Sequence, residues 1–252
     1  MSSISVEVQG HIAVITMDRP PVNALVRDSY IELREIFDSV SDIPGVRVAV
    51  LRASGKAFCT GNDVGEFVGL KTGEQARAYA GIVSDGIAAV YACKIPVVAA
   101  VHGHALGAGM AIAACADVIV AAPDAQIGIP EIKVGVIGAS AFLGLIVPEK
   151  VARYLALTGK SISAEQVESY GGIQAIVPAA EVFDRAMSVA TEISAIAPRG
   201  VRYFKQAMNI NQNAMLVEKY ATESGFTAQY VGSSESRESV AAFVEKRAPE
   251  YD

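Results

Sequence analysis

The hydrophobic positions at the start of the chain alternate with polar ones. Residues 4–8 and residues 11–17 both follow this two-residue period, and Gln9-Gly10 lies between them. Alternation across a two-residue turn signal is typical of two antiparallel strands. The pattern therefore predicts a β-hairpin at the N-terminus.

Farther along, short apolar runs alternate with segments whose apolar residues recur at helical spacing. The apolar runs predict buried strands at residues 46–51, 97–101 and 118–121. The helical patterns predict helices at residues 26–41, 73–92 and 110–115. In the first of these helices the buried face consists of Tyr30, Leu33, Phe37 and Val40. Strands that alternate with helices in this way indicate layered α/β architecture.

Strand patterns nearly cease beyond residue 149. Apolar residues recur at helical spacing between residues 182 and 196, and Pro198 then opens a helix that contains residues 201–209. Residues 217–231 and 235–247 also have helical patterns. These stripes could be ordinary core, or they could pack against another subunit.

A glycine-bearing turn joins the strand at residues 97–101 to the helix at residues 110–115. It contains Gly103, Gly107 and Gly109, and a second such turn at residues 55–66 follows the strand at 46–51. Backbone N–H groups at the start of a helix favour negative charge. Glycine also lets a ligand approach the main chain closely.

Residues 124–138 place one carboxylate, Glu131, in an otherwise apolar run. Burial would raise the pKa of such a glutamate and suit it to moving a proton at carbon. Two N–H donors with one acid/base group fit chemistry that builds charge on a carbonyl oxygen. The alternative is a solvated or salt-bridged glutamate.

Composition narrows the class of protein. A hydrophobic content of 52% in 252 residues allows a large core, and a mean hydropathy of +0.35 predicts apolar surface covered by another subunit. No apolar stretch reaches membrane-spanning length, and the N-terminus has no secretory pattern, so we expect no membrane association. A net charge of −6 argues against nucleic-acid binding. The scattered Cys59, Cys93 and Cys115 indicate reduced thiols in a cytoplasmic protein, and their spacing is not that of a metal site.

Three segments together resemble the signatures of the enoyl-CoA hydratase/isomerase (crotonase) superfamily. Residues 56–63 resemble its K-A-F-x-x-G-x-D loop, residues 96–109 its P-x-x-A-x-x-x-G-x-A-x-G-x-G stretch, and residues 125–135 its A-x-x-G-x-P-E-x-x-x-G segment. The similarity extends from Ile4 to Tyr251.

The resemblance implies an α/β fold built as a repeated ββα spiral, with a C-terminal helical region that drives oligomerisation. It divides the chain into a spiral core at residues 1–195 and a trimerisation region at residues 196–252. It further implies a homotrimer or homohexamer acting on an acyl-CoA thioester, with coenzyme A as part of the substrate and no other cofactor.

The resemblance also implies roles for individual residues. Glu131 matches an acid/base glutamate, and Asn62 and Ala108 occupy the positions whose backbone N–H groups form the family's oxyanion hole. The positions implied to line the substrate or CoA site are Asn23, Ala24, Leu25, Phe58, Cys59, Thr60, Gly61, Asp63, His104, Gly107, Ala111, Ala139, Phe243 and Lys246. For Lys246 the alternative is a solvated helix face.

Ala111 departs from the hydratase pattern, which has a second glutamate at this position. Another carboxylate position of the family holds Ala139, and residues 140–144 replace its usual Gly-Gly-Thr/Ser-Gln-Arg run. One carboxylate suffices to shuttle a proton between two carbons, so isomerisation is chemically easier than hydration here. His102 or His104 could replace the missing acid/base group, although packing is the simpler interpretation.

The sequence therefore predicts an enzyme of the enoyl-CoA hydratase/isomerase type. The alternatives are an acyl-CoA-binding protein without turnover and a specialised hydratase for an unusual acyl group. A nicotinamide oxidoreductase lacks its G-x-G-x-x-G fingerprint here, and a hydrolase elbow lacks its G-x-S-x-G.

Overall fold

A six-stranded sheet forms the centre of the protein. The computed structural model describes residues 3–70, 72–213, 218, 221, 225–226, 233–248 and 250. The sheet has the order β1-β2-β3-β4-β6-β9, and only β1 and β2 are antiparallel neighbours. Its strands are β1 (Ile4–Gln9), β2 (Ile12–Met17), β3 (Val48–Ala53), β4 (Val97–Val101), β6 (Val118–Ala121) and β9 (Ala175–Ile176).

A smaller sheet of three short strands stands beside the first. It consists of β5 (His104–Leu106), β7 (Gln126–Gly128) and β8 (Ser161–Ser163), in that order. The sequence patterns did not predict this sheet, because three residues are too few to show a two-residue period. It holds the glycine turn after β4 against the segment that precedes Glu131.

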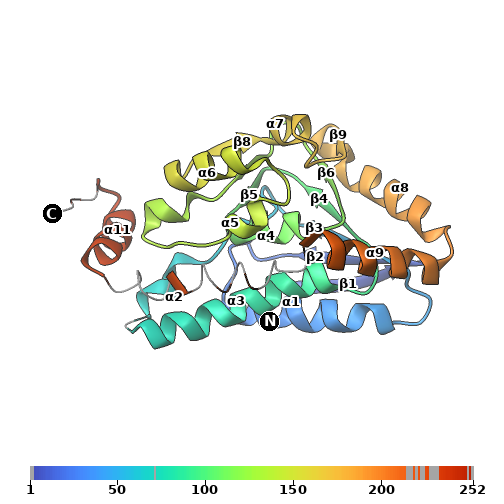
Figure 1. The fold of residues 1–252 in the computed structure, drawn as a ribbon, viewed down its shortest axis with the longest axis horizontal. Coiled ribbons are helices and arrows are strands. Elements are labelled where there is room, and N and C mark those ends of the chain that lie inside the picture. The colour runs from blue at the N-terminus through green and yellow to red at the C-terminus, as the bar shows by residue number, and fades with distance from the viewer. Residues whose placement is uncertain are drawn as a thin grey trace.

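Helices cover both sides of the large sheet (Figure 1). In that view α1 and α3 lie along one side and α8 lies along the other, while α6 and α7 lie beside β8 of the smaller sheet. The described α-helices are α1 (Arg27–Ser39), α2 (Val64–Val68), α3 (Gly73–Ala92), α4 (Ala108–Ala114), α5 (Ser140–Leu143), α6 (Glu149–Thr158), α7 (Ala164–Ser169), α8 (Val182–Ser194), α9 (Pro198–Asn213) and α11 (Ser234–Glu245). The 3₁₀ helices are η1 (Val40–Asp42), η2 (Pro130–Val134) and η3 (Ala179–Glu181).

Most of the predicted elements are confirmed. The strands at residues 97–101 and 118–121 and the helix at residues 73–92 have the predicted bounds. The hairpin forms, but its turn is Gly10-His11, since Gln9 pairs with Ile12. The strand predicted at residues 46–51 begins two residues later, and the helix predicted at 110–115 begins at residue 108.

The buried face of α1 packs closely against α3. Tyr30, Leu33 and Phe37 are buried, as the spacing predicted. The helices approach so closely at Gly86 that a β-carbon there would lie 2.8 Å from the Tyr30 carbonyl oxygen. This contact places the Tyr30 side chain between the two helices and the loop that follows β3.

Helix α9 attaches to the sheet at the start of β4. In α9, the buried Lys205 ammonium lies 2.6 Å from Asp117 Oδ2 and also donates to the Ile95 carbonyl at 3.1 Å. The helix predicted at residues 217–231 lies largely outside the described residues. The division at residue 195 and the trimerisation role of the tail remain predictions. Within the described chain, no helix is both long enough and apolar enough to span a membrane.

Candidate functional site

Two glycine turns meet backbone to backbone at the site. Gly61, with φ +93°, lies so near the second turn that a β-carbon would be 3.0 Å from the Leu106 carbonyl oxygen and 3.5 Å from Ala108 N. Gly109 packs on Cys59 with no space for a side chain. Only glycine fits positions where another main chain comes this close. The glycines therefore fix Asn62 beside Ala108.

The backbone N–H groups of Asn62 and Ala108 are available to a ligand. Leu25 N donates to Gly61 O and Asp63 N donates to Leu25 O, both at 2.8 Å, so the N–H of Asn62 points away from Leu25. Ala108 is the first residue of α4, where an N–H has no intrahelical acceptor. Neither group donates to an acceptor in the described part of the chain.

Glu131 faces these two donors from η2. Its carboxylate packs on Gly107, where a β-carbon would lie 2.8 Å from Glu131 Cδ. Pro130 starts η2, and Gly135, with φ +76°, ends it. Ser236 Oγ of α11 donates to the Gly135 carbonyl at 2.7 Å, so the C-terminal helix supports the segment that carries Glu131.

Three cavities share Glu131 as a lining residue. One of about 320 Å³ is bounded by Thr60, Gly61 and Asn62 on one side and by Phe243 of α11 on another. A constriction of about 30 Å³ lies between Asn62, Ala108 and Ala139. A third cavity of about 220 Å³ continues toward α6. A larger cavity of about 490 Å³ between α2 and α11 includes neither Glu131 nor the two N–H donors.

This combination of fold and site agrees with the comparison of the sequence with known families. The sequence profile described as enoyl-CoA hydratase/isomerase matches residues 7–252. The chain belongs to the enoyl-CoA hydratase/isomerase family. It is an enzyme of that family and has the crotonase α/β fold with C-terminal helices.

Individual relatives of the family have different activities. The chain is 34% identical to "(7aS)-7a-methyl-1,5-dioxo-2,3,5,6,7,7a-hexahydro-1H-indene-carboxyl-CoA hydrolase" of Rhodococcus jostii, over 94% of this chain and 92% of that one. It is 33% identical to (E)-benzylidenesuccinyl-CoA hydratase of Thauera aromatica, over 98% of both chains. A solved enoyl-CoA hydratase/isomerase from Xanthobacter autotrophicus superposes with a TM-score of 0.89 at 25% identity, covering 98% of this chain and 97% of that one.

The loop at residues 20–25 supports the site from behind. Asn23, which is 2% exposed, donates from Nδ2 to the Ser54 and Ala57 carbonyls at 2.8 Å each and accepts from Arg19 N at 2.7 Å. The Ala24 carbonyl accepts from Arg19 Nη1. These bonds use the Asn23 amide to hold the loop against the first glycine turn, and they leave the amide no part in lining the cavities.

The turn that follows β3 is held by hydrogen bonds to neighbouring segments of the main chain. Phe58 and Cys59 are fully buried, and Thr60 Oγ1 donates to the Val22 carbonyl at 3.3 Å. Burial raises the pKa of the Cys59 thiol to about 12, so this cysteine stays neutral. Asp63 caps α2 by accepting from Gly65 N and lies 3.1 Å from Arg19. Of these residues only Thr60 lines the cavity beside Glu131.

Other predicted site residues are spread over a wider region. His104 is exposed on β5, and His102 Nε2 is bonded to the Gly55 carbonyl at 2.9 Å, so neither imidazole lines the cavities around Glu131. Ala111 is fully buried in α4. Ala139, with φ +67°, lines the constriction. Lys246 is exposed where α11 ends.

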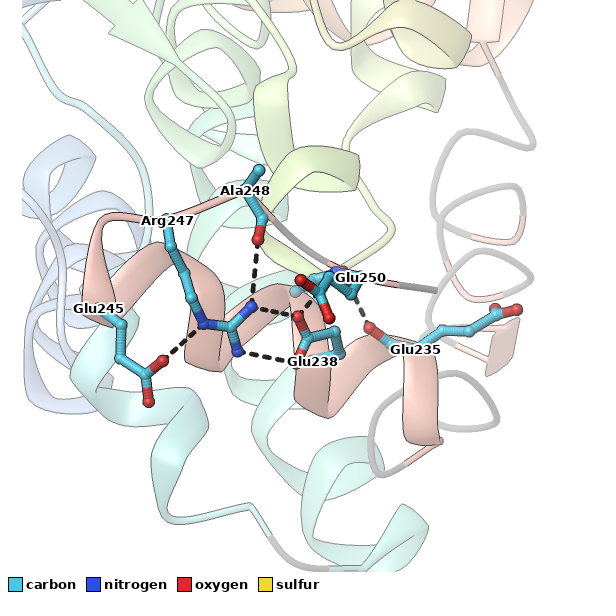
Figure 2. A network of polar contacts seen from close by, with 7 residues as sticks. Glu235, Glu238, Glu245, Arg247, Ala248 and Glu250 are labelled. Carbon is cyan, nitrogen blue, oxygen red and sulfur yellow. Dashed lines mark hydrogen bonds and ion pairs between the residues drawn. The ribbon is translucent and has the colours of Figure 1, made fainter. Parts of the chain in front are cut away.

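An ionic network fixes the end of α11, the helix that carries Phe243 (Figure 2). Arg247 Nη2 donates to Glu238 Oε2 at 2.9 Å, and Arg247 Nε donates to Glu245 at 2.6 Å. Glu250 N donates to Glu238 Oε1 at 2.8 Å. The Arg247 hydrogen bonds lower the pKa of Glu238 to about 2. The network folds the residues after α11 back onto that helix.

Two tyrosines belong to the site although no motif indicated them. Tyr30 of α1 donates to Asn62 Oδ1 at 2.7 Å, and Tyr79 of α3 donates to the same oxygen at 3.2 Å. Tyr79 also lines the constriction beside Glu131. Desolvation raises the pKa of Tyr79, so its hydroxyl remains a donor. Helical spacing indicated that Tyr30 is buried, but sequence spacing cannot show which loop meets it.

Proposed function

We propose that the protein stabilises the enolate of an acyl-CoA thioester between the N–H groups of Asn62 and Ala108. Enolate charge resides on the thioester oxygen, and two fixed donors stabilise it more strongly than they stabilise the neutral carbonyl. The observation that supports the proposal is that Gly61 lies close to the Ala108 backbone, with no space for a side chain, while Glu131 packs on Gly107.

Glu131 is the proton carrier in this proposal. In isomerisation of a 3-enoyl-CoA, its carboxylate takes a proton from C2 and the electron pair moves to the thioester oxygen. The same proton then returns at C4 as the double bond moves into conjugation, and nothing else is consumed. This cycle needs one acid/base group within reach of both carbons.

Hydration of a 2-enoyl-CoA is the alternative reaction of the same site. It adds the oxygen of water at C3 and a proton at C2, and a second carboxylate would activate that water. Ala111 and Ala139 supply none at the family's two positions. We therefore place isomerisation first, with a specialised hydratase next and acyl-CoA binding without turnover after it.

Hydrolysis of an oxo-substituted acyl-CoA is a second candidate. The name of the Rhodococcus jostii relative describes a hydrolase of a dioxo bicyclic acyl-CoA. Hydrolysis also passes through charge on oxygen, which paired N–H donors stabilise. Unlike isomerisation, it consumes one water and breaks a bond, so the mass of the products separates the two reactions.

The Glu131→Gln variant tests the proposal. Wild-type protein and this variant are each given 3-enoyl-CoA, crotonyl-CoA and a cyclic 3-oxoacyl-CoA, and products are identified by mass spectrometry. Loss of the acid/base group should lower turnover of the true substrate by about 10²–10⁴, while CoA-ester binding survives because glutamine keeps the shape. Turnover at the wild-type rate in the variant would remove Glu131 from the mechanism.

The oligomeric state and the cellular compartment proposed for the enzyme are those expected from its family. We propose a homotrimer or a pair of trimers acting in the cytoplasm, with CoA supplied by the substrate. The exposed Val68, Phe243 and Val244 near the large cavity between α2 and α11 are apolar surface that a neighbouring subunit would cover.

A further inference from the structure

The side-chain oxygen of Asn62 accepts hydrogen bonds from two tyrosine hydroxyl groups. Tyr30 and Tyr79 are 0% and 3% exposed, and a buried tyrosine hydroxyl needs an acceptor. Asn62 Oδ1 accepts from both, at 2.7 Å and 3.2 Å. An amide oxygen has two lone pairs, so these bonds use its capacity. The arrangement fixes the amide with its oxygen toward α1 and α3.

The amide nitrogen of Asn62 consequently faces away from the tyrosines. Asn62 is half-buried and lines both the 320 Å³ cavity and the constriction next to Glu131. Asn62 Nδ2 donates to no acceptor in the described chain, and the atom is not fully buried. Nδ2 is thus an accessible donor, without a described acceptor, on a residue that lines the site.

We infer that Asn62 Nδ2 donates a hydrogen bond to an oxygen on C3 of the acyl group, which makes Asn62 a specificity-determining residue for 3-oxo or 3-hydroxy acyl-CoA thioesters. The inference rests on the enolate stabilisation of the proposed function, which puts the thioester oxygen on the backbone N–H of the same residue. Because a 3-enoyl-CoA has no oxygen on C3, the inference favours hydrolysis of an oxo ester, or formation of a 3-hydroxy ester, over isomerisation among the reactions proposed above. An oxygen on C3 is separated from that oxygen by three carbon atoms. In this inference one asparagine supplies a donor to each of the two oxygens.

A plain alkyl chain should bind this site less tightly than an acyl chain with oxygen on C3. It would cover Nδ2 without offering an acceptor, and an amide N–H buried in that way loses its hydrogen bond to water. The remaining carbon skeleton has room in the 220 Å³ cavity beyond Glu131, whose lining includes Ile129, Val136 and Leu157. In this inference Asn62 Nδ2 therefore lies near the thioester, and the apolar lining residues lie farther along the acyl chain.

Binding of three CoA esters tests the inference without relying on turnover. Dissociation constants are measured by calorimetry for butyryl-CoA, acetoacetyl-CoA and 3-hydroxybutyryl-CoA, with CoA alone as reference. The proteins are wild type, Asn62→Ala and Asn62→Asp. Alanine removes Nδ2 but keeps the backbone N–H. Aspartate keeps an acceptor for both tyrosines and removes the donor, so it serves if the alanine variant does not fold.

The wild type should bind at least one C3-oxygen ester more tightly than butyryl-CoA. That preference should fall by about threefold to tenfold in Asn62→Ala, the contribution of one net hydrogen bond, and at least as far in Asn62→Asp. Which ester loses more identifies the oxo or the hydroxy class. An unchanged preference in folded variants, or equal binding of all esters by the wild type, overturns the inference alone. Esters that bind no better than CoA alone would overturn the proposed function as well.

Discussion

Replacing Gly107 by alanine should disable the site while leaving most of the fold intact. Gly107 has φ +56° and ψ −123°, a backbone conformation that glycine adopts and alanine does not. Its added β-carbon would stand 2.2 Å from Glu131 Oε1 and 2.8 Å from Glu131 Cδ. The carboxylate would have to move by roughly 1 Å or more to reach ordinary contact distance.

The backbone strain at residue 107 and the displacement of the Glu131 carboxylate each have an expected magnitude. Backbone strain of this kind costs about 1–3 kcal/mol of folding free energy. A displacement of about 1 Å in a catalytic group costs on the order of 10² in rate. We therefore expect kcat/KM to fall about 100-fold or more, with a lowered melting temperature and the far-UV spectrum of a folded protein.

The assay follows the conjugated product of 3-enoyl-CoA isomerisation, with ester binding measured separately. Gly81→Ala is the matched control, because a β-carbon at Gly81 in α3 meets no atom within 4 Å. Alanine there should stabilise the helix by about 0.5–1 kcal/mol and leave the rate unchanged. A folded Gly107→Ala enzyme with turnover within threefold of wild type would refute the placement of Glu131 against Gly107.

Three further predictions concern assembly, reaction type and pH. Light scattering at micromolar concentration should show a trimer or hexamer, and a clean monomer would contradict the role given to the C-terminal helices. Ala111→Glu should raise hydration of a 2-enoyl-CoA relative to isomerisation if the missing carboxylate limits hydration. Because Ala111 is fully buried, the new carboxylate should have a raised pKa. An unchanged ratio of hydration to isomerisation in a folded, ester-binding variant would count against this explanation. The Glu238 carboxylate should titrate near pH 2 by NMR, so its bond to Arg247 is intact above the ordinary glutamate pKa and is lost as pH falls toward about 2. The Arg247→Ala variant should raise this midpoint toward the ordinary range, because it removes the largest cause of the shift.

The sequence predicted those elements whose ends are marked by local chemistry. Pro96 precedes β4, and Thr72 with Gln75 forms the capping box that starts α3, so both elements have the predicted bounds. Helix α4 begins before its first large apolar residue, because Ala108 and Gly109 show no periodicity. The three-residue strands of the smaller sheet carry too little pattern to be predicted from sequence.

For the candidate site too, local motifs could be predicted from the sequence, whereas contacts between distant segments could not. The motifs placed Asn62, Ala108 and Glu131 in one site, and the structure brings these three residues to one constriction. The motifs could not show that the Asn23 amide bonds to the main chain, because its partners at Ser54 and Ala57 lie more than 30 residues away. Such contacts depend on how separate loops pack, which periodicity does not describe.

Under the proposals above, Ala111 and Asn62 are compatible with the same kind of substrate. Ala111 supplies no carboxylate that could activate water, and Asn62 supplies a side-chain amide whose oxygen accepts from Tyr30 and Tyr79. An acyl group that already carries oxygen at C3 needs no hydration and offers an acceptor to Nδ2. Charge that develops on a 3-oxo thioester spreads over two oxygens, and in our proposal the backbone and side chain of Asn62 supply a donor for each. In our proposal the absence of a water-activating carboxylate and the presence of the Asn62 side-chain donor are therefore compatible, since both would favour enolate chemistry on an oxygenated acyl group over addition of water to a plain one.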